Sequence, residues 1–152
     1  MHLDKEDIKI SVDSLNELLA NTYVLSVKTQ NFHWNVEDPR FAMLHDFFGN
    51  HYEMLIEAID EIAERIRMLG ECAPGSMAGY LKVASVKEAG LIQDGTSMLQ
   101  ELAKDHRIVI GILRKSIECV TKTQDQGTLD FLIGRLQEHE KMAWMITSHC
   151  KA

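Results

Sequence analysis

Apolar residues recur along this chain at intervals of three and four, the spacing that places them on one face of an α-helix. Four long segments carry the pattern, and the breaks between them contain Pro, Gly or polar turn residues. The predicted helices run from Asp4 to about His33, from about Phe41 to about Gly70, from Asp94 or Thr96 to Val120, and from about Thr128 to within two or three residues of the C-terminus. The pattern therefore predicts an all-α protein.

The same periodicity predicts the face that each helix turns toward the core. In the second helix this face is an apolar stripe of six residues: Leu44, Phe48, Leu55, Ile59, Ile62 and Ile66. His106 falls within the apolar stripe of the third helix and is interpreted as a core histidine. On the fourth helix, His139 lies between Glu138 and Glu140 and is predicted to face solvent or another subunit.

The lengths of the connections predict the topology. Residues 35–40 are a short link, so the first two helices should be antiparallel neighbours. Residues 71–95 are long for a loop but suit a crossover running the length of a bundle, and Ser85 and Glu88 have the spacing of a capping box that would start a short helix. The fold class predicted is a single domain, residues 1–152, forming a four-helix ferritin-like bundle with a short helix in the crossover between helices 2 and 3.

Composition narrows the class of protein. The chain is 45% hydrophobic and 26% charged, and it has no apolar stretch long enough to span a bilayer. Its first residues, MHLDKEDIK, have no apolar signal core, and its three cysteines are widely spaced, so we expect a cytoplasmic protein with reduced thiols. A net charge of −7 disfavours binding to nucleic acid.

A polar line beside the apolar stripe of the second helix carries the candidate chemistry. Asp60 and Glu64 are spaced i,i+4, so their carboxylates project from one patch, and His45 lies on the same line. His33, at the end of the first helix, should approach His45 through the short link. Two imidazoles and two carboxylates suit iron, manganese or zinc. The alternative is that the two acids form a solvated helix face.

Distance decides how these residues can meet. His45 and Asp60 are fifteen residues apart, which corresponds to about 22 Å along one helix. Metal–ligand bonds are about 2 Å long, so the four side chains cannot share a cation within one chain. They can meet when two copies of the second helix pack antiparallel across a two-fold axis.

Several common chemistries are missing from the sequence. It contains no phosphate-binding loop, no nucleophile elbow and no HExxH motif. None of its seven histidines has Glu three residues earlier, so the Glu-x-x-His di-iron centre built within one bundle is not expected.

The sequence resembles the Dps-type miniferritins, the DNA-binding proteins from starved cells, over nearly its whole length. His33-Trp34-Asn35-Val36 is similar to the family's HWN segment, and His45 follows His33 at the family's interval of twelve. Residues 60–65, DEIAER, resemble its DxxAER segment. Residues 74–88 resemble its crossover, and residues 142–145 resemble its closing helix.

The resemblance implies a homo-oligomeric shell, a hollow dodecamer, that is a ferroxidase and an iron store. It would oxidise Fe(II), preferably with hydrogen peroxide or else with oxygen, and keep the ferric mineral inside. By matched position His33 and His45 come from one subunit, and Asp60 and Glu64 come from its two-fold neighbour. Trp34 would either exchange electrons with the metals or pack at the two-fold interface.

One position departs from the family. Gly49 stands where the family often has Asp, four residues after the second histidine. We therefore expect one tight metal position and a weak or empty second one, with Asp46 or Glu53 as possible substitutes. Gly49→Asp should then strengthen the second position. Asp125 and Asp130 would either line an iron entry pore or cap the fourth helix.

Two rival functions remain. The first is DNA compaction, which some members of the family achieve through lysine-rich tails. Here Lys5 and Lys9 are accompanied by three acids in the first ten residues, and a shell of twelve subunits at −7 each would carry −84 formal charges. DNA binding is thus disfavoured. The second rival is a helical oligomeric protein without metal chemistry.

Overall fold

The computed structural model describes residues 3–150, and within them every regular element is an α-helix. The elements are α1 (Lys5–Asn35), α2 (Phe41–Met68), α3 (Met77–Val83), α4 (Gly95–Val120) and α5 (Gln126–Cys150). The all-α prediction and the four long helices are confirmed, with boundaries within a few residues of those expected.

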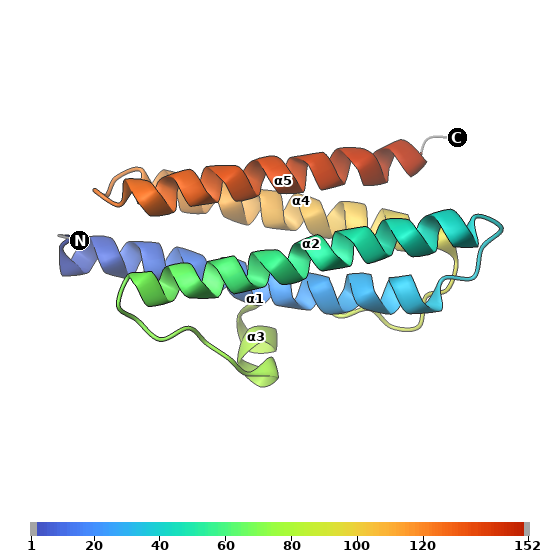
Figure 1. Ribbon diagram of the computed structural model, residues 1–152, viewed down its shortest axis with the longest axis horizontal. Helices are drawn as coiled ribbons and strands as arrows, with labels where there is room; N and C mark the ends of the chain where they lie inside the picture. Colours follow the sequence, from blue (N-terminus) through green and yellow to red (C-terminus); the bar gives the residue numbers. More distant parts are fainter. Residues whose placement is uncertain (1–2, 151–152) are drawn as a thin grey trace.

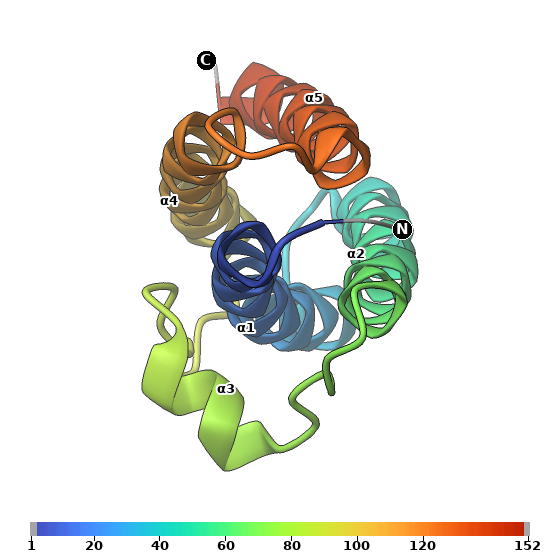
Figure 2. The ribbon, with the colours of Figure 1, turned by 90° about the vertical axis from the view of Figure 1, so that its left-hand side faces the viewer.

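The four long helices lie side by side, and α3 sits outside them against α1 (Figures 1 and 2). The chain runs along α1, returns along α2, and then crosses the length of the bundle through α3 before it returns again along α4 (Figure 1). The predicted crossover is therefore present. It makes α2 and α4 parallel and leaves α5 to close the bundle between them.

Side-chain caps account for the starts of the helices. Asp4 Oδ1 accepts a hydrogen bond from the Asp7 N–H at 2.8 Å, and Asp94 Oδ2 accepts one from the Ser97 N–H at 2.8 Å. Ser76 caps α3 in the same way.

The short helix of the crossover was predicted at the wrong place. It spans Met77–Val83, and Ser85 does not start a helix. The reason is a long-range contact, because the backbone N–H groups of Ser85 and Val86 both donate to Asn21 Oδ1 of α1, at 2.8 and 2.9 Å. This buried amide fixes the second half of the crossover to the bundle.

The predicted apolar stripes form the core. Five of the six stripe residues of α2 are fully buried, and Ile59 is partly buried against them. His106 is buried, as interpreted from its place in the stripe of α4. His139 was predicted to face solvent or a neighbour, and this was wrong, since its side chain is 0% exposed. Within residues 3–150 no helix is both long and apolar enough to cross a membrane.

Candidate metal centre

The end of α1 and the start of α2 bring His33 and His45 together. The short link between the helices is held by the Glu37 N–H, which donates to the Gln93 carbonyl at 2.8 Å, and by Arg40, which bonds its own loop partner Asp38. His33 and His45 are both half-buried, and their rings stack with centroids 4.0 Å apart. The predicted approach of the two imidazoles is therefore present in the structure.

Two reciprocal hydrogen bonds fix the orientation of these rings. His33 Nδ1 lies 2.6 Å from the His45 carbonyl oxygen, and His45 Nδ1 lies 2.7 Å from the His33 carbonyl oxygen. A carbonyl oxygen only accepts, so each Nδ1 must carry the proton. Each Nε2 of a neutral ring is then left with a free lone pair. This is the arrangement that prepares imidazoles to bind a metal, with the second ring nitrogen anchored to a carbonyl.

The stacking also determines how many cations the pair can serve. The planes of the two rings are only 15° apart, so the Nε2 lone pairs run in nearly parallel planes. Two imidazoles on one tetrahedral cation, with bonds of about 2.0–2.1 Å, would have centroids about 5 Å apart. The observed centroids are only 4.0 Å apart, so a single shared cation would require one ring to turn.

Gly49 makes room for this arrangement. A Cβ atom on residue 49 would lie 2.8 Å from His33 Cε1 and 2.9 Å from His33 Nδ1. The imidazole of His33 thus occupies space that any other side chain would claim. The sequence showed only that a carboxylate was missing at this position, and the close approach of the ring could not be read from it.

The structure does not bring the carboxylates to the histidines. Asp60 and Glu64 are exposed on α2, one helical turn apart and far along the helix from His45. Among residues 3–150 no three His, Cys, Asp or Glu side chains are grouped so that they could hold a metal ion. The imidazole pair and the carboxylate pair are therefore separated within one chain, as the distance argument expects. The assignment of Asp60 and Glu64 as ligands stays a prediction.

The other candidate residues lie at the surface. Trp34 is 64% exposed, and the Phe41 ring stacks on His45 with centroids 5.2 Å apart. Asp46 and Glu53, the possible substitute ligands, are both exposed on α2.

An ion pair that sequence reasoning missed holds the acidic end of α2. Arg65 donates to Asp125 at 2.8 Å and to Thr128 at 3.0 Å, which ties this end to the start of α5. Asp125 is buried and also accepts from the N–H and hydroxyl of Thr128. Burial by itself would raise the pKa of Asp125, but these hydrogen bonds hold it below its usual value.

Asp125 therefore caps α5, which is one of the two roles that its position allowed. Asp130, one turn further along, remains exposed. The only advance signal for the ion pair was an Arg beside the carboxylates of DEIAER, and nothing local to that segment identified its partner sixty residues away.

Comparisons with known proteins agree with this architecture. A model of the ferritin-like domain matches residues 12–152. A low-temperature-induced protein of Nostoc is 46% identical over 139 residues, which cover 90% of this chain and 78% of that protein. The DNA protection during starvation protein 2 of Bacillus anthracis is 36% identical over 89% of this chain and 92% of its own.

Solved structures give the same result. A Dps protein from Vibrio cholerae, described as a member of a broad superfamily of ferritin-like diiron-carboxylate proteins, superposes with a TM-score of 0.94 at 36% identity. The match covers 98% of this chain and 94% of that one. The chain belongs to the ferritin-like family, and within that family it is a Dps-type miniferritin.

The contact between Gly49 and His33 generates a prediction that modifies the one drawn from the sequence. Gly49→Ala should push the His33 ring from its place and weaken Co(II) binding, because the reciprocal hydrogen bonds that orient the lone pairs would be disturbed. Gly49→Asp must displace the same ring before its carboxylate can serve a second cation. The measurement is an anaerobic Co(II) titration followed by the visible spectrum, and unchanged binding by Gly49→Ala would contradict the role given to Gly49.

Proposed function

We propose that the protein is an iron store with ferroxidase activity, and that it oxidises Fe(II) with hydrogen peroxide at sites shared by two subunits. The observation that carries the proposal is the pair His33 and His45. Reciprocal hydrogen bonds fix both rings and leave two free Nε2 lone pairs at a partly exposed surface.

The missing ligands are available from a second copy. Asp60 and Glu64 project from the other end of the same helix, and two antiparallel copies of α2 would set this pair opposite the imidazoles of the neighbour. A mixed set of imidazole and carboxylate ligands suits Fe(II), which is the substrate here.

The surface around the imidazoles supports burial by another subunit. Trp34 and Phe41 are 64% and 47% exposed, and as the chain neighbour of His33 and the stacking partner of His45 they form an apolar rim beside the half-site. Large exposed apolar side chains that cluster in this way are typical of an interface. Closed assembly around two-fold axes, completed as a dodecamer, would cover this rim and enclose a space for the mineral.

In the reaction each Fe(II) gives up one electron, and each hydrogen peroxide takes two electrons as its O–O bond breaks. Water then hydrolyses the ferric product, and the released protons leave with the solvent. His33, His45 and the neighbour's carboxylates would hold Fe(II) at one tight position and, with no carboxylate at residue 49, at a weaker second one. Trp34, beside the half-site, is placed either to pass an electron or to pack the interface.

Substitution of the carboxylates tests the site. Asp60→Ala and Glu64→Ala should each slow the initial rate of peroxide-driven Fe(II) oxidation by more than roughly tenfold, since even outer-shell partners of a metal typically contribute 10–100-fold. Both side chains are exposed in the chain, so the helical content and the thermal midpoint should change little. The rate is followed by the absorbance of the ferric product.

Glu57→Gln is the matched control. It removes an exposed carboxylate from the same helix, one that lines the pocket between α2 and α5 and is not among the proposed ligands. Its rate should equal that of the unaltered protein. If both Asp60→Ala and Glu64→Ala retain the full initial rate, the carboxylate ligands have been assigned wrongly.

Direct binding of DNA is not supported, although the Bacillus anthracis relative bears the name of a DNA protection protein. The net charge is −7, and Lys9, near the N-terminus, is paired with Asp13 at 2.5 Å. The surface therefore offers no uncompensated basic tail in this segment to neutralise phosphates.

The assembled protein should not retard duplex DNA in a gel at pH 7.5 and moderate salt. Electrostatic repulsion between an acidic shell and the phosphates is the reason. Retardation that weakens steeply as salt is added would contradict this, because such a dependence indicates lysine or arginine contacts with phosphate.

A further inference from the structure

Three buried histidines and a buried arginine meet inside the bundle, away from the candidate metal centre. His51 of α2, His106 of α4 and His139 of α5 are 3%, 1% and 0% exposed, and Arg135 of α5 is 8% exposed. The rings of His106 and His139 are 5.2 Å apart, and those of His51 and His106 are 6.3 Å apart. We refer to these four residues as the imidazole cluster.

Hydrogen bonding fixes the protons within this cluster. Arg135 lies 3.2 Å from His139 Nε2, and a guanidinium only donates, so His139 Nε2 accepts. The proton of neutral His139 is then on Nδ1, which donates to His106 Nδ1 at 3.0 Å. The proton of His106 must accordingly be on Nε2. That atom is buried without a partner, and so are both ring nitrogens of His51.

This arrangement does not favour a metal ion. A histidine that binds a metal usually donates its other N–H to a carboxylate or a carbonyl. Here the other nitrogen of His139 instead faces a cationic donor, Arg135. The cluster is therefore a chain of neutral imidazoles that begins at a buried positive charge.

Within residues 3–150 no carboxylate forms a hydrogen bond or an ion pair with a histidine of this cluster. On α4, Asp105 adjoins His106 but is already paired at 2.8 Å with Lys28 of α1. Glu101 of α4 also pairs with Lys28, at 3.2 Å. Both acids are therefore directed toward the buried lysine of α1.

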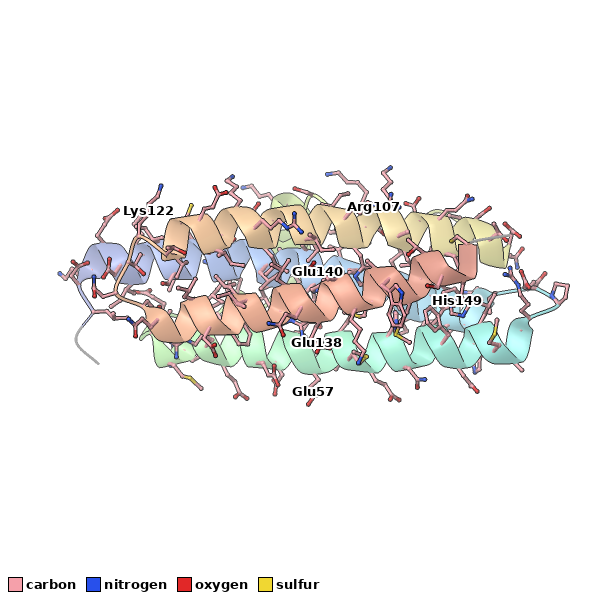
Figure 3. All side chains as sticks on the ribbon, turned by 90° about the horizontal axis from the view of Figure 1, so that it is seen from above. Glu57, Arg107, Lys122, Glu138, Glu140 and His149 are labelled. Carbon is pink, nitrogen blue, oxygen red and sulfur yellow. The ribbon has the colours of Figure 1, made fainter. Side chains whose placement is uncertain are left out.

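The remaining charges lie at the surface of the seam between α2 and α5. Glu57 and Glu61 of α2 and Glu138 of α5 line a pocket of about 210 Å³ together with Arg135. Figure 3 shows Glu138 on the side of α5 that faces α2, and Glu140 on the side that faces α4. At the C-terminal end of α5, half-buried His149 approaches His51 with Phe47 between their rings.

Protonation of any imidazole in the cluster is therefore costly in the closed bundle. Burial lowers the pKa of His51 to about 4 and that of His106 to about 3, and repulsion from the neighbouring imidazoles and Arg135 acts in the same direction on His106. Burial also lowers the pKa of His139 well below its usual value, with repulsion from His106 and Arg135 as further causes.

We propose that the imidazole cluster is an acid-operated switch that opens the seam between α2 and α5. A proton taken up by the cluster places a second positive charge beside Arg135, and water entering from the seam pocket is what solvates it. The seam is the place where this occurs, because Arg135 already joins the cluster to that pocket.

The direction of the effect follows from linkage. A histidine exposed by opening regains its ordinary pKa of about 6.5, whereas the closed bundle keeps it neutral down to about pH 4 or below. Between these values the open form binds more protons, so the closed form loses stability as the pH falls. Each histidine contributes up to about a tenfold change in the opening equilibrium per pH unit.

Hydrogen exchange of the metal-free, assembled protein measures this opening. After correction for the intrinsic pH dependence of exchange, protection of the central parts of α2 and α5 should fall between pH 6.5 and 4.5. The fall should be steeper than for α1, which contributes no residue to the cluster. An equal loss of protection in α1 would mean that the whole bundle unfolds and no seam opens.

His51→Leu is the informative variant, because the structure gives His51 no hydrogen bond to lose and leucine fills an apolar site well. In this variant the opening equilibrium constant should rise less steeply as the pH falls, by about a factor of ten per pH unit, because one titrating group has been removed. His139→Gln, which retains an acceptor for Arg135, should act in the same direction. His149→Gln removes a half-buried histidine that does not belong to the imidazole cluster, so most of the pH dependence of the opening equilibrium should remain. If His51→Leu and His139→Gln both lose protection as steeply as the unaltered protein, the cluster is not the switch.

Discussion

The exchange of hydrogen bonds between the end of α1 and the start of α2 is the contact on which the candidate site depends. Each histidine donates its Nδ1 proton to the backbone of the other, so the two helix ends and the two rings hold one another in place. The bond to His33 satisfies a carbonyl in the last turn of α1, and both bonds select the tautomer that leaves Nε2 free. Gly49 contributes the space in which the His33 ring lies.

The rigid length of α2 then decides how the site can be completed. A helix that places an imidazole at one end and carboxylates at the other separates them by about 22 Å, whatever the details of packing. The fold keeps this separation, with Arg65 tying the carboxylate end to the start of α5. Inside the bundle, at a distance from both pairs, lies the imidazole cluster.

Helical periodicity was sufficient for the elements that depend on local pattern. The long helices, the start of the first at Asp4, and the approach of His33 to His45 could all be predicted, because each follows from spacing or from a short link. Asp94 was one of the two residues predicted to start the third long helix. Features that depend on contacts between distant segments could not be predicted from the sequence. Asn21 holds Ser85 out of a helix, and His139 has charged neighbours in sequence yet turns into the core toward His106. Neither contact leaves a local signal.

Mixing of subunits tests most directly whether the site is shared. One variant would lack both histidines (His33→Ala with His45→Ala), and the other would lack both carboxylates (Asp60→Ala with Glu64→Ala), so neither alone should oxidise Fe(II) rapidly. In a shell assembled from equal amounts of both, each mixed two-fold pair regains one complete site, and about a quarter of the unaltered rate should return, as expected for random pairing across a two-fold axis. A mixed shell as inactive as its parents would show that the four residues do not form one site between subunits.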